Sequence, residues 1–427
     1  MKLTFIIAEY NPFHNGHLYQ IRRAKAMTGS DYTIVLMSGD FVQRGGPACA
    51  DKYTRTRMAL AGGADLVLEL PCLGAGSSAE TFAACAVSLA NRLMLPSVSQ
   101  AWLCFGCENA GSPILEEAAA LLAAEPDSFK RELKEKLKRG ANYPAARSQA
   151  LIHELTGRST DIPDKGGHLY SPETIRDILA APNNILAIEY YKALIRSSSR
   201  IRPLPMGRRG AGHSDMDSQG QYMSAGALRA ALARGDTKSA ETAMPSQAAC
   251  ILREKLNEGG IMQTDDFFDL ISYALLCSRG RLNEYCDVSD DLADRLENAG
   301  GTFSSLDELT DHIRSKNITA ARVRRCLFHI MLGHKKAFFE SWKASAYAGP
   351  LSVLGFRKEA AGILSLAGKA KEKNHLILRS ADREKLAGIE RQISQNDLFA
   401  SRLYRMVYGH KYKLGQKDIL SEAVIKM

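Results

Sequence analysis

The chain has 427 residues, of which 45% are hydrophobic and 24% charged, and its formal net charge is +9 at pH 7. This hydrophobic content excludes a disordered chain, and charges interrupt every apolar run before the ~20 residues that a membrane-spanning helix needs. We therefore expect a soluble protein of two or three domains. The odd number of cysteines, most of them in apolar surroundings, favours a cytoplasmic location. The excess of cations favours a polyanionic partner such as nucleic acid, although many basic enzymes bind only small phosphates.

The first 110 residues alternate short β-rich runs with segments of helical periodicity, which is typical of a parallel sheet flanked by helices. The predicted strands cover residues 3–8, 32–37, 65–70 and 101–105, and the predicted helices cover residues 17–27, 52–62 and 78–93. Parallel sheets bind ligands beyond the carboxyl ends of their strands. The loops that follow these strands are therefore where we expect a site.

Beyond residue 110 the predicted elements are mostly helical. Residues 114–137 have the periodicity of one helix, whereas residues 156–182 contain several glycines and prolines and are interpreted as an inserted loop. Further predictions are a helix over 184–194, a strand near 201–206 and a helix over 224–234. From about residue 244 onward, helical periodicity dominates and few β signals remain.

The cysteines predict no disulfide framework. They are nine, an odd number, and most of them lie in apolar surroundings, which favours reduced thiols. Cys104 and Cys107 have the C-x-x-C spacing of a metal or redox pair, but no second pair accompanies them and Cys104 lies in a predicted strand. We interpret both as buried thiols, and we predict no protein-bound metal.

The strongest signal is carried by the segment after the first strand, Tyr10-Asn11-Pro12-Phe13-His14-Asn15-Gly16-His17. It places two imidazoles three residues apart at a helix start, where free N–H groups and the helix dipole attract anions. Gly16 would let a phosphate approach the backbone closely. A two-histidine metal site lacks the glutamate of H-E-x-x-H and a third ligand, and buried structural histidines are the other alternative. We interpret the segment as a nucleotide-phosphate site.

An H-x-G-H motif after a first strand resembles the nucleotidyltransferase superfamily, and a longer series narrows the resemblance to the bacterial tRNA(Met) cytidine acetate ligase family. The series spans nearly the whole chain, at residues 9–17, 37–45, 51–55, 69–71, 104–106, 182–186, 208–211, 224–229, 322–325 and 353–356. The resemblance implies an α/β fold: a Rossmann-like, ATP-binding parallel-sheet domain over residues 1–240, with an insertion at about 156–182, and a mostly helical, tRNA-binding domain over residues 241–427. Departures from the family pattern at residues 213–215 and 226 affect the contacts around residues 205–230.

Members of this family use ATP and acetate to form acetyl-adenylate and then acetylate N4 of the wobble cytidine of elongator tRNA(Met). The resemblance thus implies a ligase that uses ATP, accompanied by Mg²⁺, and whose partners are acetate and elongator tRNA(Met). No membrane and no stable protein partner are expected. A small-molecule adenylyltransferase of cofactor biosynthesis and a non-catalytic tRNA-binding protein are the alternatives.

The resemblance also implies a set of site residues. His14, His17 and Lys52 are the expected catalytic residues, which would stabilise charge on the phosphates. Asn183 has the alternative of capping a helix that starts at residue 184, and Ser224 that of a simple N-cap. Isolated ATP contacts are expected at Gly106, Asn183, Arg208, Arg209, Ser224 and Arg229. The other expected ATP contacts form one run: Ile7, Ala8, Glu9, Tyr10, Asn11, Pro12, Phe13, His14, Asn15, Gly16, His17, Leu18, Tyr19 and Gln20.

Two basic stretches are candidates for RNA binding. Arg322, Arg325 and His329 share one face of a predicted helix, and we expect this face to contact RNA. Residues 402–417 interleave arginines and lysines with three tyrosines, for which stacking on bases and packing on a core both stay open.

Overall fold

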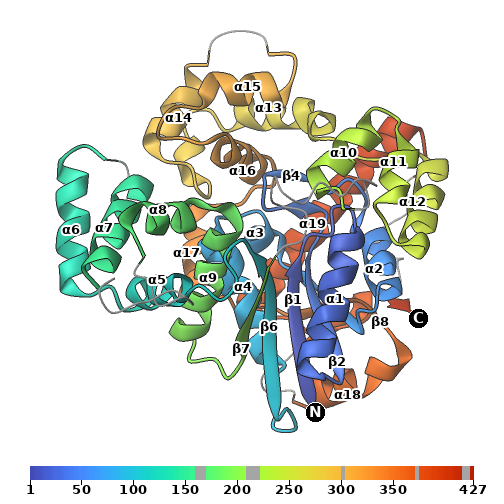
Figure 1. Cartoon of the computed structure of the whole chain (residues 1–427). Helices are drawn as coiled ribbons and strands as arrows, with labels where there is room; N and C mark the ends of the chain where they lie inside the picture. Colours follow the sequence, from blue (N-terminus) through green and yellow to red (C-terminus); the bar gives the residue numbers. More distant parts are fainter. Residues whose placement is uncertain (142, 159–169, 208–221, 300–302, 371–374, 416–423) are drawn as a thin grey trace.

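A sheet with five parallel neighbouring strands, in the order β5–β2–β1–β6–β7, forms the centre of the protein (Figure 1). The structure is a computed structural model that describes residues 1–141, 143–158, 170–207, 222–299, 303–370, 375–415 and 424–427. The order of the strands reverses between β1 and β6. In sheets of this kind the ligand crevice lies at that switch point, outside the carboxyl ends of the strands. The five strands are β1 (Lys2–Ala8), β2 (Tyr32–Ser38), β5 (Leu66–Leu70), β6 (Gln100–Cys107) and β7 (Arg202–Gly207).

Helices cover both faces of this sheet. Its strands are apolar on both sides, and successive side chains of a strand point to opposite faces, so each face carries a core. Ile6 and Val35 share one core with α1 and α2, whereas Phe5 and Leu36 share the other with α4, α5 and α9. The predicted fold class is confirmed, and the bounds are α1 (Asn15–Thr28), α2 (Lys52–Ala61), α4 (Ala79–Arg92), α5 (Pro113–Ala124) and α9 (Pro182–Arg196).

Two predictions for residues 110–182 are wrong. The helix predicted over 114–137 is two helices, α5 and α6 (Asp127–Lys138), because Glu125 adopts a left-handed conformation with φ 45° and Pro126 follows it. The loop predicted over 156–182 contains the end of α7 (Tyr143–Arg158) and all of α8 (Pro172–Ala180). Proline occupies the first position of α8, where a missing N–H costs nothing, so here it starts a helix.

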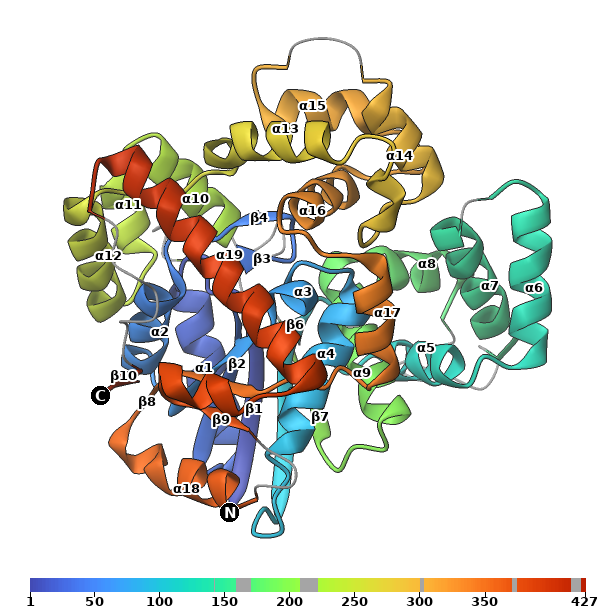
Figure 2. The same ribbon diagram turned by 180° about the vertical axis from the view of Figure 1, so that it is seen from behind.

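The C-terminal half is helical, as predicted, but it also extends the sheet. Strand β8 (Leu351–Phe356) pairs antiparallel with β5, and β9 (Leu376–Ile377) and β10 (Ile425–Lys426) pair with β8. The long helix α19 (Gly388–Tyr412) crosses the back of the molecule diagonally (Figure 2). The division at residue 240 stays a prediction, and the two halves share one sheet.

A third core lies on the side of the carboxyl ends of β1, β2 and β6, where α13–α16 gather in both views. Phe41 of the short hairpin β3–β4 packs there against Phe267, Phe328 and Tyr404. No described helix is both long and apolar enough to cross a membrane. The other elements are β3 (Phe41–Val42), β4 (Gly46–Pro47), α3 (Cys72–Ala75), α10 (Ala225–Ala233), α11 (Thr237–Thr242), α12 (Ser246–Glu258), α13 (Phe268–Cys277), α14 (Asp290–Glu297), α15 (Leu306–Ile313), α16 (Ala320–Met331), α17 (Lys336–Ala344), α18 (Ala361–Lys369) and the 3₁₀ turns Thr264–Phe267, Leu282–Glu284, Lys358–Ala360 and Ser380–Lys385.

Candidate active site

The two predicted histidines lie together at the N-terminus of α1. Nδ1 of His14 accepts a hydrogen bond from the N–H of Gly16 at 3.1 Å, and Nδ1 of His17 accepts one from the N–H of His14 at 3.2 Å. The two rings stack with their centroids 3.7 Å apart. Because both Nδ1 atoms act as acceptors, each neutral ring carries its proton on Nε2, the atom that can donate to an anion.

Close packing holds these rings in place. Tyr10 and Phe13 are fully buried, and the Tyr10 ring meets that of His17 edge to face at 4.7 Å. A Cβ at position 16 would lie 2.9 Å from Cε1 of His14, so any side chain there would displace the ring. Glycine at position 16 therefore has a second function besides the predicted one: it leaves room for the ring of His14.

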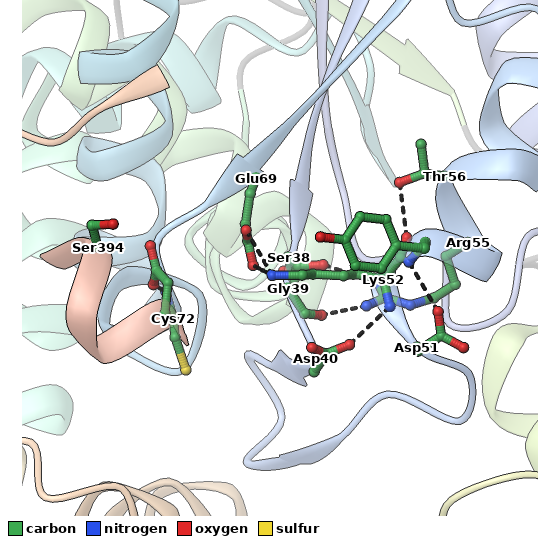
Figure 3. A network of polar contacts seen from close by, with 12 residues as sticks. Ser38, Gly39, Asp40, Asp51, Lys52, Arg55, Thr56, Glu69, Cys72 and Ser394 are labelled. Atoms are coloured by element: carbon green, nitrogen blue, oxygen red, sulfur yellow. Dashed lines mark hydrogen bonds and ion pairs between the residues drawn. The ribbon is translucent and has the colours of Figure 1, made fainter. Parts of the chain in front are cut away.

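Arg55 of α2 ties this segment to the next strand. Its side chain is fully buried, and its guanidinium donates to the carbonyls of Glu9 at 2.6 Å, Ser38 at 2.9 Å and Ala50 at 2.9 Å. A fourth bond reaches the carbonyl of Gly39 (Figure 3). The carboxyl ends of β1 and β2 are thus joined through one side chain, which sequence reasoning missed; the only signal was its place in the motif at residues 51–55.

Of the two ATP contacts predicted on α10, Arg229 reaches the segment after β1 and Ser224 caps its own helix. Arg229 donates to the carbonyl of Asn11 at 2.7 Å, so α10 lies against the loop after β1. Ser224 accepts the N–H of Ala227 at 3.2 Å and acts as the N-cap of α10, which is its simpler interpretation. Arg208 and Arg209 lie outside the described residues, directly after the end of β7.

The predicted contacts near β6 lie beside the switch point. Gly106 is the penultimate residue of β6, and the side-chain amide of Asn183 donates to the Glu108 carboxylate at 2.6 Å. The capping alternative for Asn183 is wrong, because α9 already begins at Pro182. The next residue, Asn184, is fully buried. Its Oδ1 accepts the N–H of Glu108 at 3.0 Å, which fixes the chain after β6.

A pocket of about 470 Å³ runs along α1 next to the histidine segment. Asn15, Leu18 and Tyr19 belong to the predicted ATP run, and two arginines add positive charge. The predicted run therefore borders an open volume, which is lined by Asn15, Leu18, Tyr19, Arg22, Arg23 and Tyr222.

Lys52 is engaged in a buried ion pair. Its side chain is 2% exposed, and its ammonium lies 2.7 Å and 2.9 Å from the two carboxylate oxygens of Glu69 in β5 (Figure 3). Burial alone would lower the pKa of Lys52, but the carboxylates of Glu69 and Asp40 outweigh burial and raise it. The catalytic role of Lys52 stays a prediction. In the fold, Lys52 joins the start of α2 to β5 through its ion pair with Glu69.

The carboxyl group of Asp397 in α19 is buried near the ion pair of Lys52 and Glu69. It accepts the N–H of Cys72 at 2.7 Å, and burial, assisted by the charge of Glu69, raises its pKa to about 7. In an unfolded chain the pKa of an aspartate is about 3.9. Protonation of Asp397 therefore favours the folded state at low pH, and this contribution is lost as the pH rises from about 4 to about 7.

The substitution Asp397→Asn is accordingly expected to stabilise the protein at pH 8 and to change its stability little at pH 4. Over that interval the difference in unfolding free energy should grow by about 1 kcal/mol per pH unit. Urea unfolding of both proteins at several pH values measures it, with the exposed Asp294→Asn as the control. The same difference at pH 4 and pH 8 would contradict this role of Asp397.

One predicted RNA contact is wrong. His329 is 2% exposed, its Nδ1 lies 2.9 Å from Nδ1 of His334, and burial lowers its pKa to about 3. The face of α16 that it shares with Arg322 and Arg325 turns inward. Both arginines lie within 3.5 Å of the Asp287 carboxylate, so an RNA phosphate would have to compete with that carboxylate for them.

The tyrosines of the second basic stretch pack on a core. Tyr404 and Tyr408 are buried, the hydroxyl of Tyr404 donates to the carbonyl of Ala48 at 2.9 Å, and that of Tyr412 donates to Ile261 at 2.6 Å. Of the two interpretations left open, the structure supports packing. The buried-thiol interpretation of the C-x-x-C pair is confirmed, since both thiols are buried and free.

The strand order 3-2-1-4-5 with two imidazoles at the switch point defines a nucleotide-binding protein of the nucleotidyltransferase class. Residues 1–418 match the model of the HIGH Nucleotidyl Transferase family. The tRNA(Met) cytidine acetate ligase of Halothermothrix orenii is 35% identical, with 98% of each chain covered, and that of Clostridium perfringens is 36% identical, with 88% and 89% covered. The crystal structure of Thermotoga maritima TmcAL bound with alpha-thio ATP has a TM-score of 0.87 and 28% identity, with both chains fully covered. The chain belongs to the HIGH Nucleotidyl Transferase family and, within it, to the tRNA(Met) cytidine acetate ligases, so the predicted family and its ligase class are confirmed.

Proposed function

We propose that this protein uses ATP to activate acetate as acetyl-adenylate and then acetylates N4 of the wobble cytidine of elongator tRNA(Met). The observation that carries the proposal is the stacked pair His14 and His17, whose Nε2 donors lie at a helix N-terminus at the switch point of the sheet. The family to which the chain belongs supports the choice of substrates.

In the first step an acetate oxygen attacks the α-phosphorus of ATP, and the bond from that phosphorus to the oxygen of pyrophosphate breaks. The Nε2–H groups of the two histidines and the dipole of α1 stabilise the charge that develops on the phosphate oxygens. Neither imidazole forms a covalent bond. We assign ATP binding to residues 7–20, with Gly106, Asn183, Arg208, Arg209, Ser224 and Arg229.

In the second step N4 of the cytidine attacks the carbonyl carbon of acetyl-adenylate, the bond from that carbon to AMP breaks, and N4 loses a proton. The base has to leave the anticodon stack to reach this carbon. We assign tRNA binding to residues 241–427, with Arg322 and Arg325 as the candidate contacts.

Mg²⁺ is proposed to accompany ATP. No group of three His, Cys, Asp or Glu side chains within the described ranges could hold a metal ion. Nucleotide-bound Mg²⁺ usually takes most of its ligands from phosphate oxygens and water, which suits such a site.

Incubation of the protein with ATP, acetate and unmodified elongator tRNA(Met), followed by mass spectrometry of the nucleosides, tests the proposal. We expect N4-acetylcytidine only when all three substrates are present. Pyrophosphate release that needs a mononucleotide instead of acetate would indicate a small-molecule adenylyltransferase. Binding of tRNA by folded, ATP-binding protein that forms no acetylcytidine would indicate a non-catalytic protein.

A further inference from the structure

The hairpin that follows β2 has a fixed position beside the histidine segment. At its tip the N–H of Gln43 donates to the Glu9 carboxylate at 3.0 Å, and at its base the N–H of Ala48 donates to the carbonyl of Asp40 at 2.8 Å. Gly45 has φ +76°, and a Cβ there would lie 2.5 Å from the backbone nitrogen of Arg325. The tip is therefore held between the end of β1 and helix α16.

Arg44 is the central residue of this tip, and its guanidinium forms no hydrogen bond or ion pair with any described residue. Two other arginines near Glu9 are engaged, because Arg55 donates to four carbonyls and Arg229 donates to the carbonyl of Asn11. Arg44 is exposed, and no hydrogen bond or ion pair of its guanidinium exists in the part of the chain that the structure describes. Of the three, Arg44 is the one whose guanidinium makes no hydrogen bond within the described residues, whereas Arg229 uses one nitrogen on Asn11 and Arg55 uses all three.

Three arginines surround the Glu9 carboxyl group beside this tip. Burial raises the pKa of Glu9, and the charges of Arg44, Arg229 and Arg55 oppose that rise, so three cations act on one carboxyl group. A guanidinium presents five donors in a planar fork that matches two oxygens of a phosphate. An exposed arginine on a tip that is bonded to Glu9, the residue before the histidine segment, can therefore offer this fork to a phosphate.

We propose that Arg44 binds a phosphate group in the reaction proposed above, and the inference rests on that proposed function. The phosphate belongs either to ATP, which the adjoining residues 7–20 are proposed to bind, or to the backbone of the tRNA, which has to approach the same edge of the sheet. Both sources present the same chemistry to the guanidinium, and the experiment distinguishes them.

The test uses Arg44→Gln, which keeps length and polarity, Arg44→Lys, which keeps the charge, and Arg131→Gln on α6 as a control at an exposed arginine remote from the site. ATP affinity is measured by calorimetry, tRNA affinity by filter binding at several salt concentrations, and adenylate formation by acetate-dependent pyrophosphate exchange without tRNA. Unchanged thermal unfolding shows that each variant is folded, as expected for an exposed side chain.

If Arg44 contacts ATP, Arg44→Gln weakens ATP binding or slows pyrophosphate exchange about 10- to 100-fold, and Arg44→Lys recovers part of the loss. If it contacts RNA, the exchange is unchanged, tRNA binding weakens, and the slope of log affinity against log salt becomes shallower by about one. Values within twofold of the unsubstituted protein in all three measurements would overturn the inference. Failure of the proposed function would give a different result from failure of this inference, because the unsubstituted protein would then form no acetylcytidine. The measurements of ATP and tRNA affinity would still test Arg44 in that case.

Discussion

Replacement of His14 by asparagine is expected to slow acetyl-adenylate formation about 100- to 1000-fold and to leave the fold intact. Asparagine is among the preferred N-cap residues, and its Oδ1 can accept the N–H of Gly16 in place of Nδ1. What the substitution removes is the Nε2–H donor that faces the phosphates in our proposal. His17→Asn is expected to act in the same way.

Acetate-dependent pyrophosphate exchange measures this effect, and thermal unfolding verifies that the cap survives. The exposed His410→Asn on α19 is the matched control and should retain full activity. Because two donors to the same transition state act as a unit, the double variant should lose little more than either single variant. Exchange within twofold of normal in both single variants would show that the histidines serve only as a helix cap.

The second large effect concerns the ion pair of Lys52 and Glu69. Both side chains are at most 4% exposed, and removal of one partner leaves a buried charge without compensation. Lys52→Met or Glu69→Gln alone is therefore expected to lower the free energy of unfolding by about 3–5 kcal/mol. The double variant should lose markedly less than the sum of the two, because it buries neither unpaired charge.

This double-mutant cycle also separates the two roles of Lys52. Urea unfolding gives the coupling energy, and pyrophosphate exchange by the folded double variant gives its activity. If Lys52 contacts the phosphates as predicted, the double variant folds but stays slow. If exchange recovers together with stability, Lys52 acts only through the fold. Additive losses of stability would contradict the ion-pair account.

Two features of the structure differ from the prediction made from the sequence. The loop predicted over residues 156–182 contains α8, because proline begins a helix when a neighbouring serine caps it, and composition alone does not distinguish these cases. The predicted RNA-facing His329 is buried, because α16 turns that face toward Asp287 and His334. Helical periodicity identifies the residues that share a face, but it does not identify what the face contacts.

The sequence by itself determined the features that depend on neighbouring residues. The first strands, the helix after each of them and the H-x-G-H segment follow from local periodicity and from the chemistry of a helix N-terminus. The ordered motif series also determined the family. The net charge of +9 indicated polyanions without locating their contacts.

Only the tertiary structure decided which charges the fold uses. Arg55 meets Glu9 across 46 residues of chain, Tyr404 meets Ala48 across 356, and strand β8 joins the sheet from the other half of the protein. Such contacts depend on how the chain closes on itself, because burial and pairing are properties of the assembled core and not of any single segment. The same closure leaves Arg44 exposed, without a hydrogen bond or ion pair to any described residue, on a hairpin whose Gln43 donates to Glu9, and a linear motif cannot show that.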